Sequence, residues 1–127
     1  GAGPEPRRYQ GSLVGHVLTK ITDLEVGSGE VTLETSEGVI FGMYHEQDCC
    51  EYVRIADIHG DVEDLLNSPI LYAEKSANTD NPPPDADSFL WTFYRLGTNK
   101  GSVVIRWLGE SNGYYGEGVT FVRYETN

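Results

Sequence analysis

Short runs in which apolar and polar residues alternate recur along this chain, and glycine-containing turns separate them. The run Val31–Thr35 shows the pattern most clearly, between the turns Gly27-Ser28-Gly29 and Ser36-Glu37-Gly38. Alternation with a period of two is typical of β-strands that bury one face. Turns placed this close together favour a meander of antiparallel strands. The expected strands span residues 21–26, 31–35, 39–44, 52–58, 70–74, 89–96, 102–108 and 119–124.

Two segments depart from this pattern and predict short helices. The apolar residues Leu13, Val14, Val17 and Leu18 suit one or two helical turns within residues 13–20. Asp61 is placed to cap a second short helix, because its carboxylate can accept the unpaired backbone N–H groups of a first turn. We therefore expect an α+β fold that is mainly antiparallel β-sheet, with meanders, hairpins and one or two short helices.

The length of the chain predicts a single domain. A chain of 127 residues is close to the common size of one domain. Residues 1–12 mix Gly, Pro and Arg without periodicity, which predicts a flexible leader before a single acidic β-rich domain at residues 13–127. No apolar run is long enough to span a bilayer, so no membrane partner is expected.

The negative charge of the chain is concentrated in one segment. The net charge is −11, and residues 23–64 carry twelve acids against a single base, Arg54. Direct nucleic-acid binding is not expected, since it depends on Lys and Arg that neutralise phosphates. An acidic surface instead suits solubility, a cation or a basic protein partner. The residues expected to form an acidic patch are Glu30, Glu34, Glu37, Glu46, Asp48 and Glu51.

Two neighbouring expected strands are unusually rich in aromatic residues. Alternation places Trp91 and Phe93 on one face of the first strand and Tyr94 on the other. We expect a face that carries Tyr94 and Arg106 to be exposed, where it could stack a planar ligand or anchor a protein, unless both faces are simply packed. The Asn112-Gly113 turn is expected to close a hairpin with residues 119–124. The expected ligand or partner residues are Tyr94, Arg106, Ser111, Asn112, Tyr114 and Tyr115.

The run HEQDCCE at residues 45–51 concentrates groups that can bind metal ions. Zinc sites usually draw their ligands from separated pairs, and the second pair is missing here. The run is therefore interpreted as a turn with one cysteine facing inward and no cofactor. A metal site at His45, Asp48 and Cys49 is the alternative. His59, which lies between acids, is interpreted as part of a helix start rather than as a general base.

Cys49 and Cys50 are the only cysteines of the chain. Adjacent cysteines rarely pair, because disulfide geometry strains the single peptide link between them. Two thiols in a domain without disulfide bridges suit a reducing compartment, so we expect a cytoplasmic protein.

Three segments together carry a resemblance to other proteins. They are MYHEQDCCE at residues 43–51, DIHGDVEDL at residues 57–65 and RWLGESNGYY at residues 106–115. The chain resembles, over roughly residues 13–124, a family of small uncharacterised domains found in bacteriophage and bacterial genomes. The resemblance implies an accessory protein of phage or prophage origin that acts in the host cytoplasm, and it brings no assigned chemistry.

Three functions are open at this point. The first is a non-catalytic acidic binding module that engages a host protein, for example by imitating the phosphates of DNA. The second is a nucleotide-binding protein that uses the aromatic and arginine face, and the third is a metal-dependent enzyme. No P-loop, dinucleotide-binding glycine motif, H-E-x-x-H or nucleophile elbow occurs, so nothing in the sequence calls for catalysis.

Overall fold

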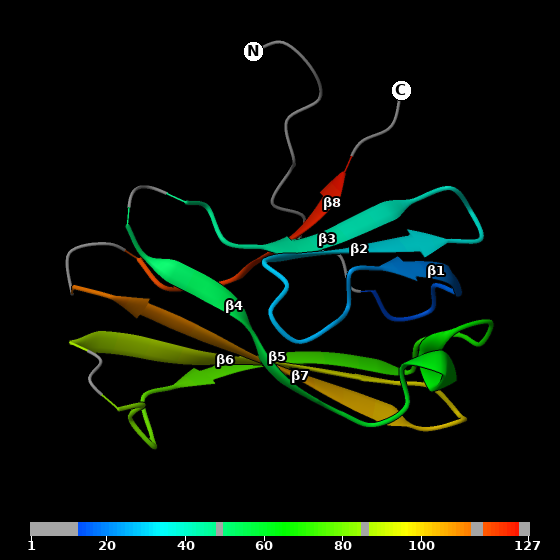
Figure 1. Cartoon of the computed structure of the whole chain (residues 1–127). Coiled ribbons are helices and arrows are strands. Elements are labelled where there is room, and N and C mark those ends of the chain that lie inside the picture. Colours follow the sequence, from blue (N-terminus) through cyan, green and yellow to red (C-terminus); the bar gives the residue numbers. More distant parts are fainter. Residues whose placement is uncertain (1–12, 48–49, 85–86, 113–115, 125–127) are drawn as a thin grey trace, which may run out of the picture.

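The computed structural model describes residues 13–47, 50–84, 87–112 and 116–124. Two four-stranded antiparallel sheets lie one over the other (Figure 1), with the strand orders β1-β2-β3-β8 and β4-β7-β6-β5. The strands are β1 (Leu18–Thr22), β2 (Glu30–Thr35), β3 (Ile40–Tyr44), β4 (Tyr52–His59), β5 (Tyr72–Asn78), β6 (Ser88–Gly97), β7 (Ser102–Ser111) and β8 (Thr120–Tyr124). The predicted predominance of antiparallel strands is confirmed.

The first sheet begins with the meander that the glycine turns predict. β1 pairs with β2 and β2 with β3, in sequence order. Val31 and Leu33 of β2 are fully buried, whereas Glu30 between β1 and β3 is exposed. The period of two thus separates a core face from a solvent face, as alternation requires.

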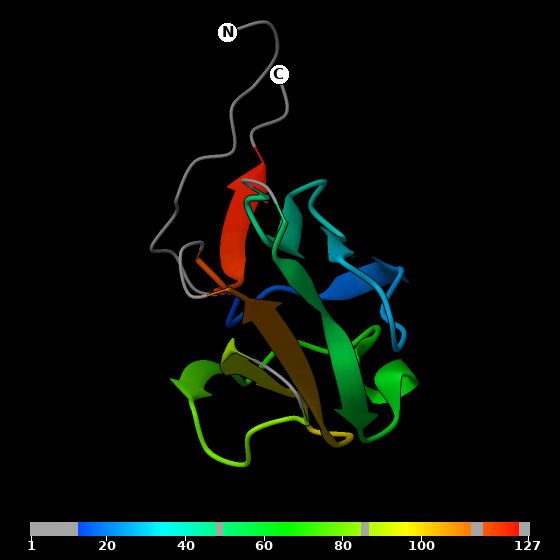
Figure 2. The same ribbon diagram turned by 60° about the vertical axis from the view of Figure 1, so that its left-hand side comes forward.

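The second sheet has the hairpin β6–β7 at its centre. Thr98 N–H donates to the carbonyl of Gly101 at 2.9 Å and closes the turn that was expected there. Ile105 and Trp107 of β7 are fully buried and face the first sheet as part of the common core. Figure 2 shows β7 beside β4, the other strand that it pairs with. One apolar layer between the two sheets therefore holds the fold together.

The α+β description is wrong in its helical part. Residues 13–20 form no helix, because Leu18 already belongs to β1 and Val17 makes an isolated bridge to Pro69. The second expected helix is a single 3-10 turn, η1 (Val62–Leu65). Its cap is confirmed, since the Asp61 carboxylate accepts from the Glu63 N–H at 3.0 Å. No helix within the described residues is long and apolar enough to cross a membrane.

The expected hairpin between β7 and β8 is also wrong. β8 leaves the second sheet and pairs with β3 in the first, with Gly42 opposite Val122. Gly42 has no side chain, and the Tyr124 ring occupies the space where a Cβ atom would lie. The chain therefore crosses between the layers after β7, which joins the two sheets at this end.

Candidate functional site

Three arginine–aromatic pairs lie on the side of the second sheet that faces away from the first. The guanidinium carbon of Arg54 is 4.4 Å from the ring centre of Tyr52, that of Arg106 is 4.6 Å from Trp91, and that of Arg95 is 5.2 Å from Tyr72. Such pairs are attractive, and they hold a guanidinium group in one position. We call this surface the arginine–aromatic face; it consists of Tyr52, Arg54, Tyr72, Trp91, Phe93, Arg95 and Arg106.

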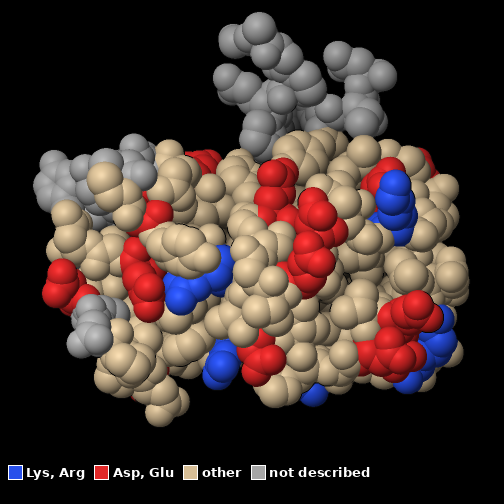
Figure 3. All heavy atoms as spheres, in the orientation of Figure 1, with Lys and Arg blue, Asp and Glu red and all other residues tan. Residues whose placement is uncertain are grey.

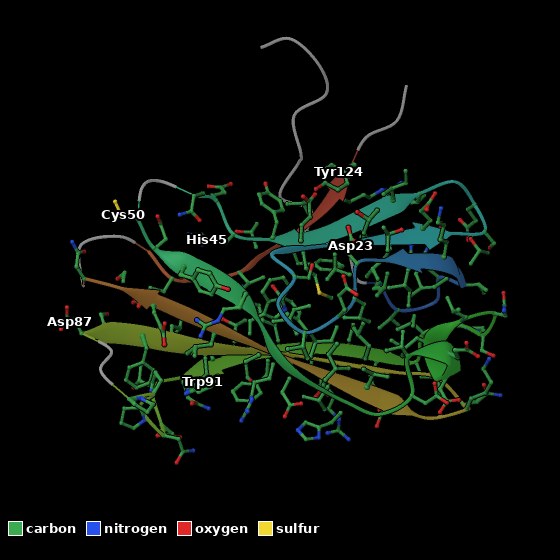
Figure 4. The ribbon with its side chains drawn as sticks, in the orientation of Figure 1. Asp23, His45, Cys50, Asp87, Trp91 and Tyr124 are labelled. Atoms are coloured by element: carbon green, nitrogen blue, oxygen red, sulfur yellow. The ribbon has the colours of Figure 1, made fainter. Side chains whose placement is uncertain are left out.

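The pair of Trp91 and Arg106 lies on the two inner strands of the second sheet, β6 and β7, and Figure 4 labels Trp91. Arg106 Nη2 lies 3.7 Å from a carboxylate oxygen of Asp57, and His59 Nε2 lies 2.8 Å from the same oxygen. Trp91 Nε1 donates to the carbonyl of Asn81 at 3.2 Å, which ties the β5–β6 loop to the ring. The side chains at this position are thus held in place before any partner arrives.

The pair of Arg95 and Tyr72 depends on a glycine. Tyr72 lies opposite Gly97 in the β5–β6 ladder, and a Cβ atom at Gly97 would overlap the Tyr72 ring. Because Gly97 has no side chain, the ring can lie over the strand and support the Arg95 guanidinium. An aromatic side chain over a glycine on the neighbouring strand is a known way to fill such a gap.

Tyr94 does not belong to this face, so the expectation that it accompanies Arg106 is wrong. In the β6–β7 register Phe93 lies opposite Arg106, whereas Tyr94 lies opposite the buried Ile105. Tyr94 is 4% exposed, and its hydroxyl donates to the carbonyl of Val119 at 3.0 Å. Lys75 Nζ donates to the same carbonyl at 2.7 Å. Tyr94 therefore joins the second sheet to the segment that leads into β8.

Tyr94→Phe is expected to show how this buried hydroxyl links stability to pH. At pH 7 the variant should lose about 1 kcal/mol of unfolding free energy, the typical contribution of one hydrogen bond. Burial raises the pKa of the Tyr94 phenol well above its ordinary value, so the unfolded state loses that proton first as the pH rises. Wild-type stability should then fall relative to the variant above about pH 10, by about 1.4 kcal/mol at pH 11.

Urea unfolding at several pH values from 7 to 11 measures the difference in unfolding free energy between wild type and Tyr94→Phe. This range includes the ordinary tyrosine pKa of about 10. Burial also lowers the pKa of Lys75, and that effect is present in both proteins. A constant difference between wild type and variant across the pH range would contradict the prediction.

His45 and Glu51 form a buried pair at the end of β3. Their side chains are 7% and 0% exposed, and His45 Nε2 lies 3.0 Å from Glu51 Oε2. His45 Nδ1 lies 2.7 Å from the carbonyl of Gly118, which can only accept, so Nδ1 must carry a hydrogen. The Gln47 amide donates to the other carboxylate oxygen of Glu51 at 3.0 Å. One more proton lies between His45 and Glu51, and the pair connects the β3–β4 segment to the irregular segment that leads into β8.

The hydrogen bonds of His45 argue against the alternative of a metal site at His45, Asp48 and Cys49. Both ring nitrogens of His45 already face protein oxygens, which leaves no ring lone pair for a metal ion. The described residues contain no group of three His, Cys, Asp or Glu side chains that could hold a metal. Cys50 is exposed and disulfide-bonded, so the expectation of two free thiols, on which the prediction of a reducing compartment depended, is wrong. Asp48 and Cys49 lie outside the described residues.

The expected acidic patch is not a single surface on the side that Figure 3 shows. Acidic side chains occur there in separate groups, with basic and uncharged atoms between them. The inclusion of Glu51 in the patch is wrong, because its side chain is fully buried against His45. Glu30, Glu34, Glu37 and Glu46 lie on β2 or in the turns beside β3.

Comparison with known protein families gives one match. The sequence model of a family described as Domain of unknown function (DUF7448) matches residues 11–121. The chain belongs to the DUF7448 family. The comparisons with curated proteins and with solved structures gave no match.

The remaining expected residues of this DUF7448 domain lie away from the centre of the arginine–aromatic face. Ser111 ends β7 opposite Ser88, and Asn112 follows it as an exposed residue. Tyr114 and Tyr115 lie outside the described residues. Arg106 is the one expected site residue that lies on this face, and sequence reasoning missed the others: Tyr52, Arg54, Tyr72, Trp91, Phe93 and Arg95. Arg95 could have been found, since it is charged and shares a strand face with Trp91.

Proposed function

We propose that this DUF7448 domain is a non-catalytic binding module that engages a protein partner through the arginine–aromatic face. The observation that carries the proposal is the Arg106 guanidinium held 4.6 Å from the Trp91 ring on a sheet surface that turns away from the core. Trp, Tyr and Arg are the residues that contribute most binding energy in protein interfaces. Three arginine–aromatic pairs on one surface supply all three types.

The charge of this face also suits a protein partner. The chain has a net charge of −11, which disfavours nucleic acids and other strongly anionic partners. On the arginine–aromatic face, however, the three arginines lie among the carboxylates of Asp57, Glu74 and Glu110. The face is thus nearly neutral and rich in aromatic surface, the composition typical of interface centres.

The other functions have less support. An acidic decoy needs a continuous acidic surface, and Glu51 is buried while the acids in Figure 3 are interrupted. The nucleotide site expected from Tyr94 and Arg106 loses its stacking ring, because Tyr94 lies in the core. The resemblance to bacteriophage and bacterial domains supports an accessory role, in which the partner is a host protein met in the host cytoplasm.

The proposal is tested by hydroxyl-radical footprinting of the captured complex. The immobilised protein is incubated with a bacterial host lysate at low salt, and the oxidation of each tryptophan is compared before and after capture. Oxidation of Trp91 should slow several-fold in the complex, whereas the fully buried Trp107 should stay unreactive in both samples and serve as the internal control. Unchanged oxidation of Trp91 together with protection of Tyr44 or Tyr124 would place the interface on the first sheet and overturn the proposal.

A further inference from the structure

A hollow of about 540 Å³ lies on the arginine–aromatic face where β5 meets β6. Half-buried Phe93 and Val104 give it an apolar floor, while exposed Arg95 and Glu74 face each other across the two strands. Lys75 also lines it, but its Nζ is bonded to the Val119 carbonyl. The hollow therefore offers one cation and one anion above an apolar surface.

Arg95 differs from the other two arginines of the face. Arg54 has the Glu110 carboxylate at 3.3 Å and Arg106 has that of Asp57 at 3.7 Å. Within the described part of the chain, the Arg95 guanidinium has no ion pair and no hydrogen bond, and it lies over the Tyr72 ring. Gly97 lets that ring lie beneath the guanidinium. The side chain is thus supported from below while its N–H groups stay open to a ligand.

The chemistry of the hollow selects among occupants. An arginine fork binds a carboxylate through two parallel hydrogen bonds. Glu74 can accept a hydrogen bond from an N–H group that lies beside the carboxylate in the ligand. Glu74 also repels a phosphate more strongly than a carboxylate, because a phosphate carries more negative charge. The last residue of a polypeptide combines a free carboxylate, an amide N–H and a side chain on one Cα atom. Trp91 lies on the same face of β6, so a chain leading to that residue can continue across the sheet.

We infer that this hollow anchors the carboxyl-terminal residue of the protein partner, with an apolar last side chain on Phe93 and Val104. Arg95 binds the terminal carboxylate, and Glu74 accepts from the amide of the same residue. This inference rests on the proposed function and adds the part of the partner that enters the face.

The probe is N-acetylphenylalanine, which carries the carboxylate, the amide and the apolar ring of such a terminus. Titration followed by ¹H–¹⁵N correlation spectra should shift the amide signals of β5 and β6, with a dissociation constant on the order of 1 mM for a ligand of this size. N-acetylphenylalanine amide, which lacks the carboxylate, should bind at least about tenfold more weakly. Arg95→Gln should weaken binding of the acid to the same degree, whereas Lys20→Gln, at an exposed position on β1 of the first sheet, should leave the affinity unchanged.

Several outcomes would overturn the inference. Equal binding of the acid and its amide, or equal binding to wild type and Arg95→Gln, would remove the role of Arg95. Shifts caused only by adenosine monophosphate would assign the hollow to nucleotides, and shifts caused only by free phenylalanine would assign it to free amino acids. If the acid causes no shift while Trp91 is still protected in the captured complex, the anchor is wrong and the proposed function stands.

Discussion

Glu51→Ala is expected to lower the free energy of unfolding by about 3–5 kcal/mol. The substitution leaves the buried His45 ring without its 3.0 Å carboxylate partner, and the Gln47 amide loses the carboxylate but keeps the backbone carbonyl of residue 51, at 2.6 Å, as an acceptor. Removing one member of a buried, hydrogen-bonded pair costs more than the pair itself contributes, because the other member stays desolvated and loses this partner. A loss of this size is a large part of the stability of a typical domain.

Urea unfolding at pH 7 measures this effect, with Glu25→Ala as the control. Glu25 lies in the exposed β1–β2 loop, and its replacement should change stability by less than about 0.5 kcal/mol. His45→Ala and the double variant complete a cycle in which the two losses should be strongly non-additive. Equal, small losses for Glu51→Ala and Glu25→Ala would mean that the buried pair does not form.

The two tryptophans are expected to differ in how much unfolding free energy the same substitution removes. Trp107 is fully buried in the core, so Trp107→Ala should cost about 3–5 kcal/mol of unfolding free energy. Trp91 lies on the arginine–aromatic face, where its loss removes one cation–π pair and should cost only about 1 kcal/mol.

Thermal and urea unfolding of both variants check this contrast. Trp107→Phe is the matched control for the core, since it keeps an aromatic ring and removes an indole N–H that has no partner among the described residues. It should lose clearly less stability than Trp107→Ala. Similar losses for Trp91→Ala and Trp107→Ala would contradict the assignment of one face to the core and the other to solvent.

The strands were predictable because each has a short period-two pattern bounded by turn residues. Val31 and Leu33 alternate with polar neighbours, and β2 and β3 lie near their expected places, whereas β1 runs from Leu18 to Thr22 instead of over residues 21–26. The prediction of a helix within residues 13–20 was wrong because its four apolar residues fit a helical stripe and a strand with a bridge equally well. Tertiary pairing with β2 decides between them.

The candidate site was only partly predictable, because alternation defines two faces of a strand without saying which one meets the core. Tyr94 and Trp91 lie on opposite faces of β6, and both are amphipathic. The choice depends on the partner sheet, which supplies the Val119 carbonyl to the Tyr94 hydroxyl. Local sequence contains no sign of this contact across the layers.

The burial of Glu51 and the path of β8 have the same cause. The His45 ring that contacts the Glu51 carboxylate is also hydrogen-bonded to the carbonyl of Gly118, 73 residues further along the chain. The Asn112-Gly113 signal for a hairpin was overridden because β8 completes the first sheet beside β3. Contacts between residues so far apart in sequence require the three-dimensional arrangement before they can be recognised.

The most direct measurement is the dissociation constant of the captured partner protein for wild type and for Trp91→Ala, with Lys20→Ala on the first sheet as the control. If the partner binds the arginine–aromatic face, Trp91→Ala should bind it at least about 30-fold more weakly, which is the effect of losing one interface hot spot. The affinity of Lys20→Ala should be unchanged. An affinity of a stably folded Trp91→Ala within about twofold of wild type would contradict the account.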